Sequence, residues 1–103
     1  MKKIALITGA TSGIGEACAR RFADGGYDLI ITGRRAEKLA AIKEDIEAQG
    51  TKVKTLTFDV RDADAAEAAI NSLEPEWRNL DVLINNAGLA LGLDKEFEGD
   101  PVV

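Results

Sequence analysis

Glycines and hydroxyl residues are concentrated in one short segment near the N-terminus, where their spacing could bind a phosphate group. Residues 8–15 read Thr-Gly-Ala-Thr-Ser-Gly-Ile-Gly, with glycines at 9, 13 and 15. A turn of this kind exposes backbone N–H groups at the start of a helix, where the helix dipole also attracts an anion. Glycines leave room for a pyrophosphate to approach the backbone. The segment predicts a phosphate-binding turn, with a purely structural glycine turn as the alternative.

Two arginines, Arg34 and Arg35, follow the second apolar run, at the position that determines the choice between NAD and NADP. In a site that prefers NAD, an acidic residue about 20 positions after the glycine turn binds the ribose 2′-hydroxyl. Here residues 32–35 read Thr-Gly-Arg-Arg and contain no acid. Guanidinium groups would instead pair with the 2′-phosphate of NADP. The segment therefore favours NADP(H). The alternative is that both arginines are simply solvated at a helix start. Positive charge at that place interacts unfavourably with the helix dipole, which favours a functional reason for the pair.

Asp59 and Val60 follow the third apolar run of the chain. A carboxylate at this place could accept a hydrogen bond from an adenine amino group, and the valine could pack on the ring. The alternative is an ordinary turn or helix-cap aspartate.

Residues 85–88 read Asn-Asn-Ala-Gly and follow the fourth apolar run. The ends of parallel strands on this side of an open sheet line the ligand crevice. We expect the two amides to tie neighbouring strands and loops together. Ala87 and Gly88 would let a cofactor approach closely.

The elements that must position these groups alternate along the chain. The apolar runs at 4–7, 29–31 and 82–84 are continuous and indicate strands buried on both faces. The interrupted apolar run of Val53, Leu56 and Phe58 marks a further strand. Apolar residues at helical spacing indicate three helices between them, with stripes at 14, 17, 18 and 22, at 39, 42 and 46, and at 66, 69, 70 and 73. The order β-α-β-α-β-α-β predicts an α/β fold, the N-terminal half of a Rossmann-like, doubly wound parallel sheet.

Composition narrows the classes of partner. The 103 residues carry a net charge of −5 and no dominant basic stripe, which argues against nucleic acid and anionic membranes as partners. The chain has one cysteine, Cys18, and no histidine, so no intrachain disulfide can form and we expect no metal site. Residues 4–7 are too short an apolar run for a signal peptide. We therefore expect a cytoplasmic protein with a single domain.

Together these motifs resemble the short-chain dehydrogenases/reductases. That family has T-G-x-x-x-G-x-G after the first strand, an Asp-Val-like pair after the third, and N-N-A-G after the fourth. All three stand in this chain at the corresponding places. Within the family, residues 32–35, 76–78 and 86–92 are similar to those of bacterial 3-hydroxy acid dehydrogenases that oxidise serine and allo-threonine.

The resemblance implies a strand order of 3-2-1-4, NADP(H) as cofactor, a small hydroxy acid or hydroxy amino acid as substrate, and a homo-oligomer. It assigns residues to the cofactor in groups: Gly9, Thr11, Ser12, Gly13 and Ile14 around the pyrophosphate, Gly15 for close helix packing, Arg34 and Arg35 at the 2′-phosphate, Asp59 and Val60 at adenine, and Asn86, Ala87 and Gly88 beside the ribose and nicotinamide.

The resemblance implies no catalytic residue within residues 1–103. The tyrosine, lysine and serine of the family lie downstream of N-N-A-G, and the single tyrosine here, Tyr27, has isoleucine rather than lysine four positions later. We expect Tyr27 to be a packing residue and the chain to be one incomplete dinucleotide-binding domain. Residues 89–103 would form a loop that leads to an absent catalytic half, with residues 82–84 at the sheet edge. The alternatives are a noncatalytic nucleotide-binding or interaction protein and a nucleotide-sugar epimerase, whose tighter glycine spacing is missing.

Overall fold

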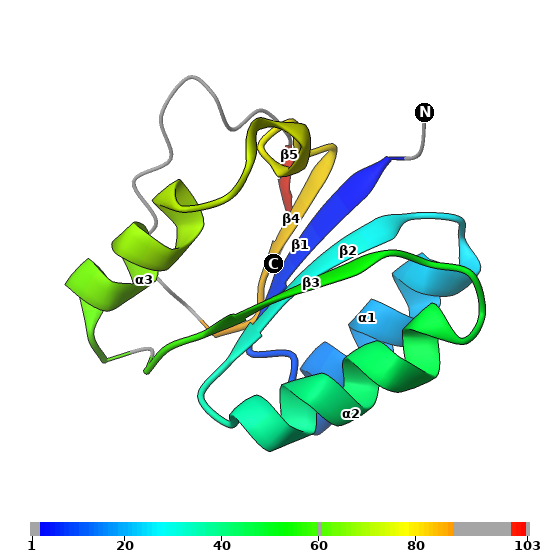
Figure 1. Cartoon of the computed structure of the whole chain (residues 1–103), viewed down its shortest axis with the longest axis horizontal. Coiled ribbons are helices and arrows are strands. Elements are labelled where there is room, and N and C mark those ends of the chain that lie inside the picture. The colour runs from blue at the N-terminus through cyan, green and yellow to red at the C-terminus, as the bar shows by residue number, and fades with distance from the viewer. Residues whose placement is uncertain (1–2, 60, 88–99, 103) are drawn as a thin grey trace.

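The computed structural model describes residues 3–59, 61–87 and 100–102, and it confirms the predicted alternation of strands and helices (Figure 1). The strands are β1 (Ile4–Thr8), β2 (Asp28–Gly33), β3 (Val53–Thr57), β4 (Val82–Asn85) and β5 (Asp100–Val102). The helices are α1 (Gly13–Asp24), α2 (Ala36–Glu47) and α3 (Ala63–Asn71), followed by a 3-10 turn over Pro75–Trp77. No helix in these ranges is long and apolar enough to cross a membrane.

The strands form one parallel sheet in the order β3-β2-β1-β4-β5. Its first four positions confirm the order 3-2-1-4. β1 lies at the centre, where Leu6 stands opposite Ile30 of β2 on one side and Leu83 of β4 on the other. Parallel neighbours require long crossover connections, and helices form those that join β1 to β2, β2 to β3 and β3 to β4. All strand ends that carry the predicted site residues therefore lie at one edge of the sheet.

The expected loop over residues 89–103 can be compared with the structure only at residues 100–102, because residues 89–99 and 103 lie outside the described residues. Residues 100–102 form β5, which pairs in parallel with Val82, Leu83 and Ile84 of β4. Pro101 conceals this strand in the sequence, because proline cannot donate a ladder hydrogen bond and usually marks a loop or an edge strand. As a result β4 has a neighbouring strand on both sides and is not the outermost strand of the sheet.

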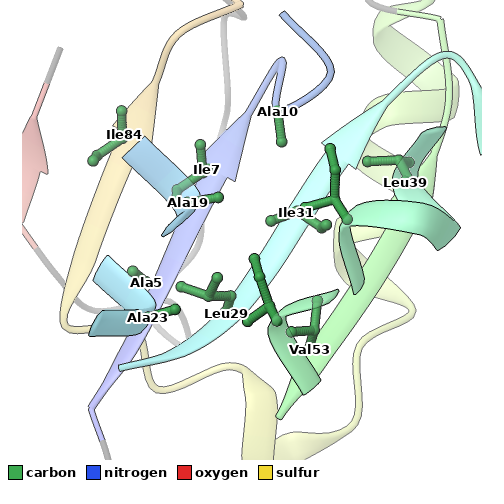
Figure 2. Packing of buried hydrophobic residues seen from close by; sticks show 12 residues of the cluster. Ala5, Ile7, Ala10, Ala19, Ala23, Leu29, Ile31, Leu39, Val53 and Ile84 are labelled. Atoms are coloured by element: carbon green, nitrogen blue, oxygen red, sulfur yellow. The ribbon is translucent and has the colours of Figure 1, made fainter. Parts of the chain in front are cut away.

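Helices cover both faces of the sheet, as in a doubly wound fold: α1 and α2 lie on one face and α3 lies on the other (Figure 1). Successive side chains of a strand point to opposite faces. Ala5 and Ile7 of β1 accordingly join the cluster under α1 and α2, and Leu6 joins the cluster under α3. Figure 2 shows the first cluster, in which side chains of β1, β2, β3 and β4 meet those of both helices. Burial on both faces explains the continuous apolar runs of β1, β2 and β4.

The buried face of α1 differs from the predicted apolar stripe. Ile14 is 72% exposed and Ala17 is also exposed, whereas Cys18 and Phe22 are partly buried against the core. The fully buried face consists of three small residues at a spacing of four: Gly15, Ala19 and Ala23. Small side chains allow the helix axis to approach the sheet closely, and hydrophobicity alone does not identify them.

Tyr27 is a packing residue, as expected. Its ring meets the ring of Phe22 edge to face, with centroids 4.9 Å apart and planes at 83°. Both rings pack against the cluster under α1 and α2. Tyr27 lies just before β2, at the N-terminal end of the strands and thus away from the edge that carries the site residues.

The close packing of α1 gives a testable asymmetry between two alanines of the same helix. Ala19→Leu should lower the free energy of unfolding by about 1–3 kcal/mol, because three more carbons must enter a filled core. Ala17→Leu should change it by less than about 0.5 kcal/mol, because the side chain is exposed. Urea denaturation of both variants measures the difference. Equal effects would contradict the assigned face of α1.

Candidate dinucleotide-binding site

The predicted site residues gather at the carboxyl ends of β1, β2, β3 and β4. The glycine turn leaves β1, the arginine pair leaves β2, Asp59 follows β3, and the asparagine pair ends β4. These strands are parallel neighbours, so their ends share one edge of the sheet. In the order β3-β2-β1-β4, the chain continues from β1 toward one side of the sheet and later returns to the other side. Ligands of open α/β sheets bind at the carboxyl ends of the strands where this change of direction occurs.

Ser12 caps the start of α1. Its backbone is extended, with φ −78° and ψ 160°, and its Oγ accepts a hydrogen bond from the Gly15 N–H at 3.1 Å. The same hydroxyl donates to the carbonyl oxygen of Gly9 at 3.0 Å. A first helical turn has several N–H groups without partners inside the helix, and the cap satisfies one of them. The rest of the turn can serve an anion, which the helix dipole favours.

The asparagine pair fastens the end of β4 to the glycine turn, as the sequence predicts. Asn86 Nδ2 donates to the carbonyl oxygen of Gly9 at 3.1 Å and to Ser12 Oγ at 2.9 Å. Thr8 Oγ1 donates to Asn85 Oδ1 at 2.9 Å and accepts from the backbone N–H of Ala87 at 3.0 Å. Two segments 77 residues apart in sequence thus form a single hydrogen-bonded unit.

Gly9 has a positive φ of +65°, and a Cβ there would lie 3.1 Å from Asn86 Nδ2 and 3.3 Å from Ala87 Cβ. Both the backbone conformation and the close approach of the β4 loop therefore require glycine. Gly15 is required for a different reason, because a Cβ there would overlap the carbonyl oxygen of Gly9 and lie 2.9 Å from Ala10 Cα.

Gly13 contrasts with both of these glycines, because a Cβ built on it meets no atom within 4 Å among the described residues. The helix start is therefore open to solvent at this position. Next to it stands Ile14, which is the one large hydrophobic side chain exposed to solvent in the described part of the chain. An open helix start beside an exposed apolar side chain fits a ligand that carries both a phosphate and an apolar group.

Arg34 and Arg35 are both exposed at the end of β2. Arg35 is the N-cap residue of α2, yet its side chain makes no capping hydrogen bond. Neither arginine forms an ion pair with another residue in the described ranges. Neither guanidinium group would have to leave an ion pair within the described ranges in order to bind a phosphate.

Asp59 is held by Arg61, a residue to which no sequence motif assigns a role. The Arg61 backbone N–H donates to Asp59 Oδ1 at 2.9 Å, and Arg61 Nε and Nη2 donate to Oδ1 and Oδ2 at 3.1 and 2.8 Å. These bonds from Arg61, with a smaller contribution from the charge of Arg34, hold the pKa of the Asp59 carboxyl well below its usual range. The only signal in the sequence was an arginine two positions after the aspartate. The adenine contact of Asp59 stays a prediction.

Two predicted residues, Val60 and Gly88, lie outside the described residues. Within the described ranges no group of histidine, cysteine, aspartate and glutamate side chains could hold a metal ion. The remaining predicted residues are brought to the one sheet edge, but their contacts with a cofactor stay predictions.

A family model described as short chain dehydrogenase matches residues 3–100. The chain belongs to this family. The match agrees with the parallel sheet, the capped glycine turn and the asparagine pair at the end of β4.

Three known proteins illustrate the similarity. NADP-dependent 3-hydroxy acid dehydrogenase YdfG of Salmonella typhi is 52% identical over 91 residues, which are 88% of this chain and 36% of the relative. Sulfoacetaldehyde reductase 2 of Chromohalobacter salexigens has the same identity and coverage. The L-sorbose reductase of Gluconobacter frateurii, solved with NADPH and L-sorbose, gives a TM-score of 0.77 at 32% identity over 84% of this chain and 34% of that one. The chain spans about a third of the length of the curated relatives it matches.

The two glycines of α1 should respond differently to alanine. Gly15→Ala should lower the free energy of unfolding by about 1–3 kcal/mol, because the added methyl group meets backbone atoms that cannot rotate away. Gly13→Ala should leave it unchanged or raise it by up to about 1 kcal/mol, since the added carbon enters open space. Chemical denaturation tests both. A Gly13→Ala variant as unstable as Gly15→Ala would contradict the assignment.

Arg61 should control the ionisation of Asp59. Arg61→Gln removes the charge and the paired donors, so the pKa of Asp59 should rise toward the usual aspartate range. Arg61→Lys keeps the charge but loses the paired geometry, so it should cause a smaller rise. A carbon-detected NMR titration of the Asp59 carboxyl measures both. Because folding lowers this pKa, the stabilisation from the pair is present at neutral pH and is lost as pH falls through the folded pKa. An unchanged titration in Arg61→Gln would contradict the contact.

Proposed function

We propose that this chain binds NADP(H) for an oxidoreductase that transfers hydride between this cofactor and a small hydroxy acid or hydroxy amino acid. The observation that carries the proposal is an open, capped helix start at Gly13 with two exposed arginines at the end of the neighbouring strand β2. The first feature suits a pyrophosphate and the second suits a further phosphate on the adenosine ribose. NADP(H) carries both groups.

Each part of the cofactor has a proposed set of partners. The pyrophosphate would lie at the first turn of α1, where Gly13 leaves room and the helix dipole favours negative charge. Arg34 and Arg35 would pair with the 2′-phosphate. Asp59, held ionised by Arg61, would accept a hydrogen bond from the adenine amino group. When bound, the nicotinamide supplies or accepts the hydride.

The substrate class rests on the similar proteins. YdfG is named for 3-hydroxy acids, and the reductase of Chromohalobacter salexigens is named for sulfoacetaldehyde. A hydroxy acid carries a carboxylate and sulfoacetaldehyde carries a sulfonate, so both names indicate a small anionic molecule. The proposal assigns cofactor binding, and no acid–base step, to residues 1–103. A cytoplasmic location and a homo-oligomeric assembly stay predictions from the amino-acid composition and the family resemblance.

The arginine pair tests the proposal. In the protein expressed from its complete reading frame, Arg34→Ala/Arg35→Ala should weaken NADPH binding by about 10- to 150-fold and leave NADH binding nearly unchanged, because charge-assisted hydrogen bonds contribute about 1.5–3 kcal/mol. Isothermal titration with both cofactors measures this. Arg21→Ala/Lys52→Ala, which removes the same charge at the opposite end of the strands, should leave both affinities unchanged. Unaltered NADPH selectivity in the first variant would overturn the proposal.

The same protein tests the substrate. A panel of serine, allo-threonine, other small hydroxy acids, steroids and acyl chains on a carrier protein should give turnover only with the small hydroxy acids. Activity confined to steroids or carrier-bound acyl chains would overturn the substrate class. Tight NADPH binding without any turnover would instead support a noncatalytic nucleotide-binding protein.

A further inference from the structure

We propose that Thr11 and Gly33 form a pair that determines cofactor selectivity, in which the Thr11 side chain occupies the space that an acidic residue at position 33 would need. This inference rests on the proposed NADP(H) function and adds a specificity determinant other than the arginines. It also explains why β2 ends in glycine, although the backbone there does not demand one.

The backbone of Gly33 is ordinary. Among the described residues, positive φ angles occur at Gly9, Gly26 and Gly50, and Gly33 is not one of them. An L side chain is therefore compatible with its backbone conformation. The reason for glycine at this position must lie in the surrounding space.

That space is occupied by the glycine turn. A Cβ on Gly33 would lie 2.8 Å from Thr11 Cγ2, 3.3 Å from Thr11 Oγ1 and 3.4 Å from Leu39 Cδ2. The first distance is shorter than two carbon atoms tolerate, so one of them must move. Threonine is branched at Cβ and has few χ1 rotamers, which limits its ability to turn away.

The two backbones are also fixed relative to each other. The backbone N–H of Ala10, next to Thr11, donates to the carbonyl oxygen of Thr32 at 2.8 Å. The carbonyl oxygen of Gly33 accepts from the N–H of Phe58 at 3.0 Å. Separation of position 33 from Thr11 would therefore break hydrogen bonds that join the ends of β1, β2 and β3.

The contact has a consequence for the cofactor. Position 33 ends β2 and directly precedes Arg34, within the segment where an acid would bind the ribose 2′-hydroxyl of NAD. Thr11 keeps a side chain, and therefore a carboxylate, out of this position. The absence of that acid and the presence of the arginines both favour binding of the 2′-phosphate of NADP(H).

The steric part of the proposal is tested without any change in charge. In the protein from its complete reading frame, Gly33→Ala should lower Tm by about 2–8 °C, which corresponds to a modest loss of stability. Thr11→Ser/Gly33→Ala should recover most of this loss, because serine lacks the methyl group that makes the 2.8 Å contact. Thr11→Val/Gly33→Ala keeps both branches and should not recover it. The single variants Thr11→Ser and Thr11→Val serve as the references. If Gly33→Ala lowers Tm equally in both of these backgrounds, the proposed pairing is overturned.

The selectivity part uses aspartate. Gly33→Asp alone should lose stability and gain no NADH affinity, whereas Thr11→Ser/Gly33→Asp should shift the ratio of NADPH to NADH affinity toward NADH by at least about tenfold. Calorimetric titration with each cofactor measures both. If Gly33→Asp alone shifts the ratio as far as the double variant, Thr11 has no role in selectivity. Equal affinity of the unchanged protein for the two cofactors would overturn the proposed function and this role with it, whereas the alanine series would still decide the contact.

Discussion

The contact between the start of α1 and the end of β1 is the constraint on which the site depends. Gly15 lies against the carbonyl of Gly9 so closely that no side chain fits between them. This contact brings the first turn of α1 to the carboxyl end of β1, where Ser12 caps the helix. Asn86 donates hydrogen bonds to the Gly9 carbonyl oxygen and to the Ser12 hydroxyl. A larger separation between the helix and β1 would move the N–H groups of the first turn away from the end of the strand.

The sheet could largely be predicted from sequence because its physical signal is local. Each interior strand is covered on both faces, so it appears as a continuous apolar run, and glycines or proline end the helices between them. The buried face of α1 could not be predicted this way, since Ala19 is selected for small size rather than hydrophobicity. β5 was missed because its pairing depends on β4, while its own residue Pro101 favours a loop.

The site residues, like the strands and helices, could be predicted from sequence only where their signal is local. Glycines, arginines and asparagines at strand ends are informative because parallel topology brings those ends together. Contacts set by side-chain geometry were not visible in the sequence. Arg61 engages Asp59 through three nitrogen donors, and Thr11 meets position 33 across the junction of two strands. Arg61 belongs to none of the motifs, and Thr11 stands at a variable position of the glycine motif, so the sequence indicates neither contact.

The central position of β1 also affects how the protein is made. One neighbour, β2, follows after a single helix, whereas the other pairs Ile7 with Ile84, 77 residues later. At about 5–20 residues per second, a ribosome needs roughly 4–15 s to make that stretch. During this interval one side of the most apolar strand has no partner, and an unpaired strand edge can recruit another chain. The topology that gathers the site residues therefore leaves the nascent chain exposed to wrong pairing until β4 emerges.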